Sequence, residues 1–98
     1  MQTINMAVQV QHLEEKHLFY ANIEGNEAFL EYRQLPNDTW EYTHTFVPKA
    51  LRGQGIANEL VKFALDFAKE NNIKVVPSCP TVKHYLEAHH EYNNILVE

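Results

Sequence analysis

The sequence predicts a mixed α/β (α+β) fold, in which an antiparallel β-meander precedes a β-α-β-α unit. Before Pro48, short segments alternate polar and apolar residues and are separated by tight turns, as in a meander. After Pro48, apolar residues recur at the period of 3.6 residues that marks a helix. A short apolar segment follows this helix. Because strand–helix–strand connections are right-handed crossovers, the strand after the helix should lie parallel to the strand before it.

Three strands are expected in the meander. Residues 18–23 and 28–33 are rich in β-forming residues, and each segment ends at a turn that contains Gly, Asn, Asp or Pro. Residues 39–47 form the third strand, which alternates strictly. We expect one face of this strand to carry Trp40, Tyr42, His44 and Phe46. A weaker signal around Val8 and Val10 indicates an earlier strand.

The helical half begins with a long helix that starts near Ile56 and ends at Asn71-Asn72. Its apolar residues cover more than half of the circumference, which is typical of a helix pressed on a sheet and flanked by a further element. Residues 73–77 form the strand parallel to the third one. A second helix follows, with Pro80 at its first position, and continues to about His89.

Length, charge and cysteine content limit the class of protein. The 98 residues predict a single domain, residues 1–98, with a modest core. Eight basic and thirteen acidic residues give a net charge of −5, which argues against nucleic acid as the main partner. A single cysteine rules out an internal disulfide and fits a reducing cytosol. No segment has the length and hydropathy of a membrane span. We therefore expect a soluble, cytoplasmic protein.

The most informative segment is Arg52-Gly53-Gln54-Gly55-Ile56-Ala57, which lies between a strand end and a helix start. Its glycines allow a sharp turn and a close approach to a ligand, and the helix N-terminus favours phosphate or pyrophosphate. Two glycines alone would favour a plain strand-to-helix turn. A Walker Gly-Lys-Ser/Thr is absent, and Asn58 stands where a Rossmann fingerprint has its third glycine.

Together with the strand before it, this segment resembles motif A of the GNAT acetyltransferase superfamily, Gln/Arg-x-x-Gly-x-Gly/Ala. Arg52, Gly55 and Ala57 match its three defined places. The strand, proline break, loop and helix also follow the family's order. The segments His44-Thr45-Phe46-Val47-Pro48 and Pro77-Ser78-Cys79 resemble a subgroup of very short members, of about one hundred residues.

The resemblance implies an acetyl-CoA-dependent N-acetyltransferase with a trimmed GNAT-like fold. In such folds two parallel strands splay apart and the pantetheine arm of coenzyme A lies between them, while loop N–H groups hold its pyrophosphate. A backbone N–H at the strand end would polarise the thioester carbonyl. Carried over to this chain, the cofactor-binding residues are Thr45, Phe46, Val47, Arg52, Gly53, Gln54, Gly55, Ile56 and Ala57.

Cys79 and His44 are the main candidates for catalysis. Cys79 stands at or beside the start of a helix, where the thiolate is favoured; the alternative is a small buried apolar residue. His44 lies on the strand expected beside Cys79. It would either deprotonate the acceptor amine or activate Cys79 to carry the acetyl group, unless it is simply half-buried. The sequence leaves these alternatives open.

Tyr85 is a weaker candidate. The resemblance suggests a tyrosine on this helix that protonates the leaving coenzyme A thiolate, but the usual Asn-x-x-Ala pattern before it is absent. Packing of the helix is the alternative role. Three histidines, His84, His89 and His90, lie near one another in sequence. His84 and His89 do not have the i, i+4 spacing of a helical ligand pair, so we predict no metal site.

The acceptor side differs most from the resembled family. Tight turns leave no room for the two helices that usually stand between its first strands, and the family's last two strands are also expected to be missing. The acceptor is therefore an unidentified amine on a small molecule or a protein, and the protein is expected to be a monomer or a weak homo-oligomer. Two alternative functions remain: a coenzyme A binding module without transfer activity, and a small interaction protein.

Overall fold

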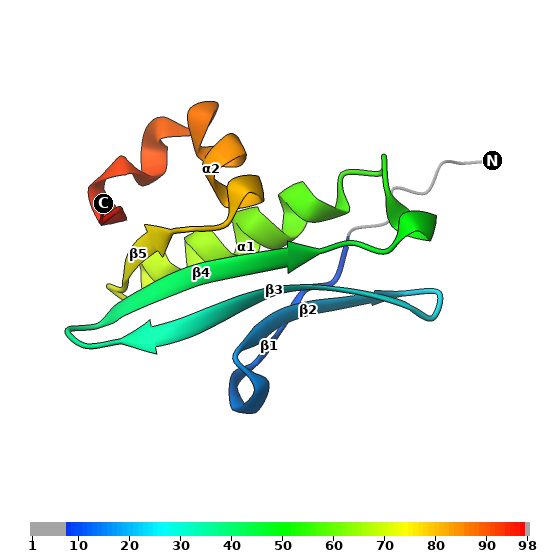
Figure 1. The fold of residues 1–98 in the computed structure, drawn as a ribbon, viewed down its shortest axis with the longest axis horizontal. Coiled ribbons are helices and arrows are strands. Elements are labelled where there is room, and N and C mark those ends of the chain that lie inside the picture. The colour runs from blue at the N-terminus through cyan, green and yellow to red at the C-terminus, as the bar shows by residue number, and fades with distance from the viewer. Residues whose placement is uncertain (1–7, 98) are drawn as a thin grey trace.

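The computed structural model describes residues 8–97 and contains one mixed sheet of five strands in the order β1-β2-β3-β4-β5 (Figure 1). The strands are β1 (Gln11–Leu13), β2 (Leu18–Ile23), β3 (Asn26–Leu35), β4 (Thr39–Phe46) and β5 (Lys74–Pro77). The first four are antiparallel neighbours, and β5 runs parallel to β4. This topology confirms the predicted meander and crossover.

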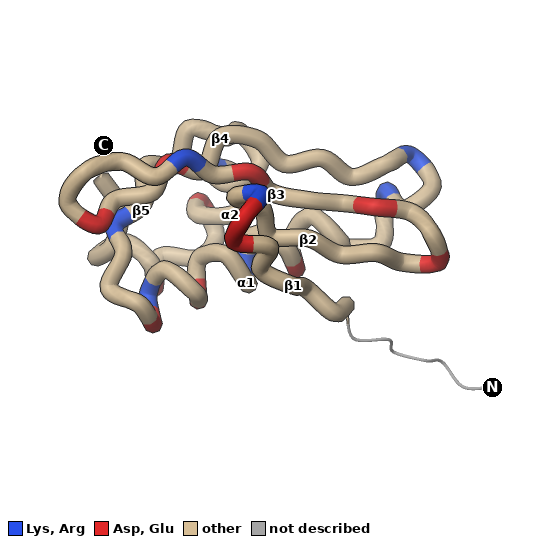
Figure 2. The backbone as a smooth tube through the Cα atoms, turned by 90° about the horizontal axis from the view of Figure 1, so that it is seen from below, with Lys and Arg blue, Asp and Glu red and all other residues tan. Residues whose placement is uncertain are grey.

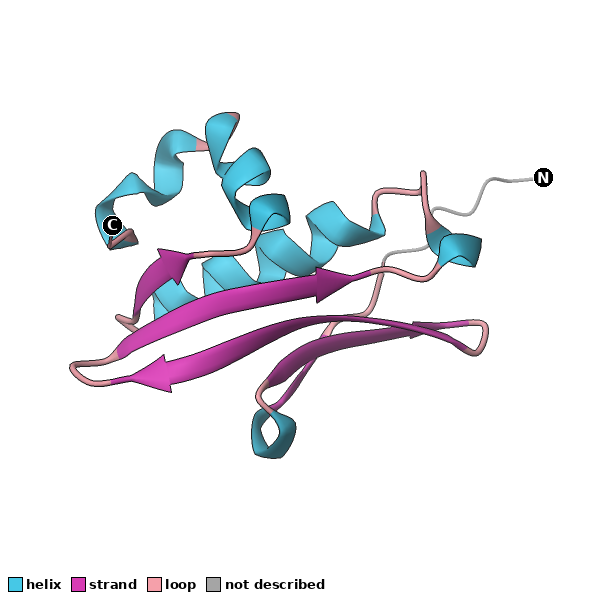
Figure 3. Cartoon of the chain, in the orientation of Figure 1, coloured by secondary structure: helices cyan, strands magenta, loops and turns pink. Residues whose placement is uncertain are grey.

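Within residues 8–97, two α-helices and three 3-10 turns complete the fold (Figure 3). They are α1 (Ile56–Glu70), α2 (Pro80–Glu87), η1 (Glu14–Lys16), η2 (Lys49–Leu51) and η3 (His90–Ile95). Strands β2 and β3 are joined by a tight turn, so no helices intervene between them, as predicted. Helix α2 ends two residues earlier than expected because the chain turns into η3, which the sequence did not indicate.

The first strand lies later than predicted. It begins at Gln11, while Val8 and Val10 precede it and pack against the core. At the other end of the chain, Val97 donates a backbone hydrogen bond to Val75 over 2.8 Å, so the segment after η3 lies beside β5. Both features concern short segments, for which tertiary contacts outweigh local propensity.

The core lies between the sheet and α1, which crosses one face of the sheet (Figure 1). Buried residues of α1 recur at helical spacing, as the sequence predicted. They pack on alternate residues of β2 and β3, because side chains of a strand point to opposite faces in turn. The Tyr42 hydroxyl, fully buried, donates a hydrogen bond of 2.6 Å to the Ala64 carbonyl and ties β4 to α1.

A β-bulge in β4 changes which side chains share a face. Tyr42 pairs with Tyr32, but the next pair is Glu31 with His44, so Thr43 is an extra residue in β4. The prediction that Trp40, Tyr42, His44 and Phe46 share one face is therefore wrong. Trp40 and Tyr42 lie on the α1 side, whereas His44 and Phe46 lie on the opposite face. We call that opposite face of β2, β3 and β4 the open face.

Candidate functional site

The two parallel strands separate beside the bulge. Strands β4 and β5 pair from Thr39 and Lys74 up to Tyr42 and Pro77. The Cys79 N–H then bonds the Tyr42 carbonyl over 3.0 Å, after which the chain turns into α2 while β4 continues to Phe46. The strands therefore splay at Tyr42, and Cys79 marks the point where they part.

Cys79 and Thr45 meet across this splay. The bulge turns Thr45 to the α1 side, and its Oγ1 lies 3.3 Å from the Cys79 Sγ. Cys79 is only 2% exposed and is the N-cap residue of α2, with Pro80 at the first helical position, as predicted. Proline suits that position because its fixed φ matches the helix and its missing N–H would have no partner there.

The environment of Cys79 favours its thiolate. Burial opposes ionisation, but hydrogen bonds from Thr45 and from the backbone N–H groups of Val82 and Thr81 outweigh it, so the pKa of the Cys79 thiol lies below its ordinary value. The donors at the start of α2 act together with the helix dipole. A cysteine with a lowered pKa is a better nucleophile at neutral pH than an ordinary buried thiol.

The glycine-containing loop joins β4 to α1. Its backbone takes the left-handed conformation at Gly53 (φ +82°) and at Gly55 (φ +80°), the latter being the N-cap of α1. The loop is anchored by the buried Leu51 and by Arg52, whose Nε donates to the Val47 carbonyl over 3.1 Å. The Gln54 amide adds a bond of 3.3 Å to the Ala50 carbonyl.

This loop has the features of an anion-binding site. The first N–H groups of α1 have no partner within the helix, and both glycines are exposed, with open space where a side chain would stand. The exposed cations Lys49 and Arg52 precede the glycines in the same loop. These donors fit the pyrophosphate of coenzyme A. The side chain of Ile56 is buried in the core, so this residue can offer only its backbone N–H.

The structure does not bring His44 to Cys79. His44 is exposed on the open face, where its register partner is Glu31 and its ring centroid lies 6.2 Å from that of Phe29. Because of the bulge, Thr45 and not His44 lies on the α1 side beside Cys79. Phe46 shares the face of His44 and is 40% exposed, and Val47 lies half-buried at the start of the loop.

Tyr85 packs within the helical layer. Its ring stacks on His89 with centroids 3.8 Å apart, and burial raises the pKa of its hydroxyl. Its neighbour Tyr92 in η3 donates a hydrogen bond of 2.6 Å to Asp66 of α1. Tyr85 therefore packs against the segment that leads into η3, and its catalytic role stays a prediction.

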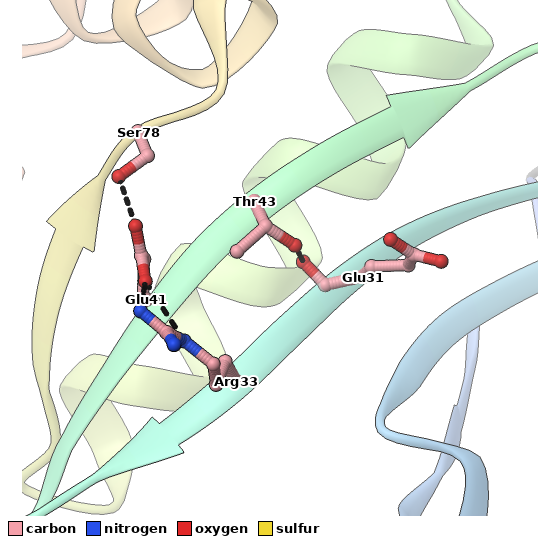
Figure 4. A network of polar contacts seen from close by, with 5 residues as sticks. All are labelled: Glu31, Arg33, Glu41, Thr43 and Ser78. Carbon is pink, nitrogen blue, oxygen red and sulfur yellow. Dashed lines mark hydrogen bonds and ion pairs between the residues drawn. The ribbon is translucent and has the colours of Figure 1, made fainter.

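A polar network that sequence reasoning missed holds the splayed strands together on the open face (Figure 4). Glu41 of β4 accepts two bonds from Arg33 of β3, of 2.6 and 3.1 Å, and one of 2.5 Å from the Ser78 hydroxyl. The bond from Ser78 and those from Arg33 lower the pKa of the Glu41 carboxyl. The Arg33–Glu41 pair follows from hairpin register, but Ser78 reaches Glu41 only through the crossover.

Neither a metal centre nor a membrane span emerges from residues 8–97. No three His, Cys, Asp or Glu side chains in this range converge as metal ligands would. In the same part of the chain, no helix is both long enough and apolar enough to cross a membrane.

Two parallel strands that splay apart, the first of which leads through a glycine loop into a helix N-terminus, define the class of GNAT-fold proteins. The family model of GCN5-related N-acetyltransferases matches residues 18–95, and the chain belongs to this family. A GCN5-like protein from Staphylococcus aureus, solved in solution by NMR, superposes with a TM-score of 0.70 at 32% identity, covering 92% of this chain and 88% of that one.

Vertebrate relatives are similar over most of the chain. The protein NATD1 of Xenopus tropicalis is 32% identical over 83 residues, which are 83% of this chain and 76% of the relative. NATD1 of Gallus gallus is 34% identical over 82% of this chain and 74% of its own length. The human NATD1 is 33% identical over 82% of this chain and 73% of its own length.

Proposed function

We propose that this protein is an acetyl-CoA-dependent N-acetyltransferase that acts on an amine acceptor. The observation that carries the proposal is the position of the Thr45–Cys79 pair, which lies where β4 and β5 part. Thr45 is on β4, the strand that leads into the glycine loop. Family membership supports the reaction class. The N–H donors and cations of the loop support a cofactor that carries a pyrophosphate.

Each part of the chain has a role in this proposal. The N–H groups from Gly53 to Ala57, with Arg52, hold the pyrophosphate, and the exposed backbone end of β4 (Thr45 to Val47) runs beside the pantetheine arm. Bound acetyl-CoA supplies an activated acetyl thioester. Backbone N–H groups at the end of β4 are suited to polarise its carbonyl. This arrangement uses the same residues for binding and for positioning the acetyl group.

For the proton transfer, we assign His44 to the acceptor. Its exposed imidazole lies on the open face, and Thr45 rather than His44 contacts the thiol. An imidazole can act as a general base and take a proton from an attacking amine. Tyr85 stays a prediction outside this proposal, because its ring packs on His89.

The lowered pKa of Cys79 favours a second route to the same product. In that route the Cys79 thiolate attacks the thioester carbonyl, an S-acetyl-Cys79 forms, and the coenzyme A thiolate leaves; the amine then displaces Cys79. A buried nucleophile of this kind requires a reduced thiol. We therefore place the protein in the cytoplasm, where thiols stay reduced.

Calorimetric titration with acetyl-CoA tests the proposal first. We expect saturable binding that Gly55→Ala weakens; absence of saturable binding in the folded protein would overturn both coenzyme A functions and favour an interaction protein. Transfer is then followed by mass spectrometry with a panel of amines. Binding without transfer to any amine would identify a binding module.

Intact-mass analysis after incubation with acetyl-CoA separates the two routes. A gain of one acetyl group that is lost on Cys79→Ala supports the covalent route. Transfer that persists in Cys79→Ala and is lost in His44→Gln supports direct transfer. An adduct that survives in Cys79→Ala excludes Cys79 as the carrier.

A further inference from the structure

A row of aromatic side chains crosses the open face. Tyr20, Phe29 and Phe46 are register partners on β2, β3 and β4, so the three side chains stand side by side on the same face. The rings of Phe29 and Phe46 lie 5.5 Å apart, and Phe46 is 40% exposed. We call these three residues the aromatic row. Apolar rings of this size on a solvent-facing sheet are typical of a surface that binds a partner.

Two exposed carboxylates flank the aromatic row on β3. Glu27 lies on one side of Phe29 and Glu31 on the other, all three on the open face. Glu27 accepts a hydrogen bond of 2.8 Å from Tyr20, whereas the Glu31 carboxylate makes no hydrogen bond or ion pair with any residue from 8 to 97. Four residues of a strand span about 13 Å, which sets the distance between the two acidic positions.

The charge of this half of the molecule is strongly acidic. Up to Val47 the sequence has seven acidic and two basic residues, and one of those cations, Arg33, is held by Glu41. Figure 2 shows acidic positions towards the tip of the β2–β3 hairpin and basic positions on the loop after β4. The glycine-containing loop and the open face thus differ in charge: the loop favours an anionic ligand, and the open face favours a cationic one.

We propose that the open face is a docking surface for a lysine-rich polypeptide segment that carries the acceptor amine. Lysine places its aliphatic stem on apolar surface and its ammonium group on a carboxylate, which is the chemistry that the aromatic row and its flanking glutamates offer. The inference rests on the proposed function, since His44, the register partner of Glu31, stands beside the docked segment. It assigns the acceptor to proteins.

The shape and charge of the face favour a polypeptide over other occupants. Small ligands bind in concave pockets, and several cavities of about 120 to 500 Å³ lie elsewhere, along α1 and at its C-terminal end. The open face is instead the surface of a sheet, along which an extended chain can lie. A second copy of this protein would place the acidic faces of both copies against each other, which is unfavourable.

Fluorescence anisotropy tests the docking surface without any need for turnover. The probe is a labelled peptide with two lysines separated by three residues in a neutral background. We expect Glu27→Gln/Glu31→Gln to weaken its binding roughly three- to thirtyfold at low salt, the effect of losing two exposed ion pairs. Phe46→Ala should weaken binding further, and acetylation of the peptide lysines should abolish it.

The matched control is Glu70→Gln/Glu87→Gln, which removes the same charge at exposed positions of α1 and α2. Equal weakening by both double variants would show non-specific attraction and overturn the proposal. So would unchanged binding in Glu27→Gln/Glu31→Gln, or binding of spermidine as tight as that of the peptide. Calorimetry with acetyl-CoA keeps the two proposals apart. A wild-type protein that binds acetyl-CoA but not the peptide overturns the docking surface alone, whereas Glu27→Gln/Glu31→Gln should retain acetyl-CoA binding while peptide binding weakens.

Discussion

The hydroxyl of Thr45 lies 3.3 Å from the thiol of Cys79, although 34 residues separate them in sequence. The pair exists because the bulge at Thr43 rotates Thr45 towards α1 and because the crossover returns Cys79 to the splayed end of β4. This contact joins the strand that leads into the glycine loop to the start of α2.

Replacing Thr45 by Val should raise the pKa of Cys79. The change removes one of the hydrogen bonds that stabilise the thiolate and leaves burial, which opposes ionisation. The pH midpoint of alkylation by iodoacetamide, followed by intact mass, should therefore move to higher pH. Thr43→Val is the matched control, because Thr43 bonds the Glu31 carbonyl rather than the thiol. An unchanged midpoint in Thr45→Val would show that the hydroxyl does not influence the thiol.

Gly55→Ala and Gly25→Ala should cost similar stability and differ in cofactor binding. Both glycines have positive φ, +80° and +86°, and neither has an atom within 4 Å of an added Cβ. The left-handed conformation costs an alanine about 1 kcal/mol in each case. Urea unfolding should report this loss in both variants. Calorimetry should find weaker acetyl-CoA binding in Gly55→Ala alone; equal binding in both variants contradicts a role for the loop.

Tyr42→Phe should lower the free energy of unfolding by about 1 kcal/mol, the net contribution of a buried hydrogen bond. The hydroxyl is the link between β4 and the Ala64 carbonyl of α1. Tyr20→Phe removes an exposed hydroxyl that bonds Glu27 and should change stability little. Chemical denaturation of both variants makes the comparison, and equal stability losses would contradict the importance of the buried link.

His12 should make the fold less stable in mild acid. Its imidazole lies within hydrogen-bond distance of the Tyr32 hydroxyl, 2.7 Å, and packs among aromatic rings. Burial lowers its pKa below 6.5, outweighing the nearby Glu14, while His17 lowers it further. The folded state thus favours neutral imidazole, so the stability contributed is full above pH 6.5 and is lost as the pH falls towards the lowered pKa.

Unfolding by urea at pH 8 and pH 5 measures this effect. We expect the free energy of unfolding to fall between these values in the wild type and to fall less in His12→Phe, which keeps a ring at that position. His84→Gln serves as the control because His84 is exposed. The same acid loss in His12→Phe as in the wild type would assign the pH dependence to other groups.

Much of this protein could be predicted from local pattern. The periods of two and 3.6 residues located the meander strands and α1, because each period records which side of an element faces the core. Pro80 predicted the start of α2, and Gly53 and Gly55 predicted a sharp turn, which the structure forms with positive φ at both residues. These are properties of single segments and need no knowledge of their neighbours.

Only the tertiary structure decided which side chains meet. A bulge arises when one strand has a residue more than its partner, and a single strand's pattern does not contain that difference. The alternation therefore predicted that Tyr42 and His44 share a face. Pairing with β3 instead places Thr45 beside the thiol and His44 on the open face. The bond from Ser78 to Glu41 likewise depends on the crossover. The sequence alone predicted most of the elements and the family, while strand register determined which side chains meet at the splay.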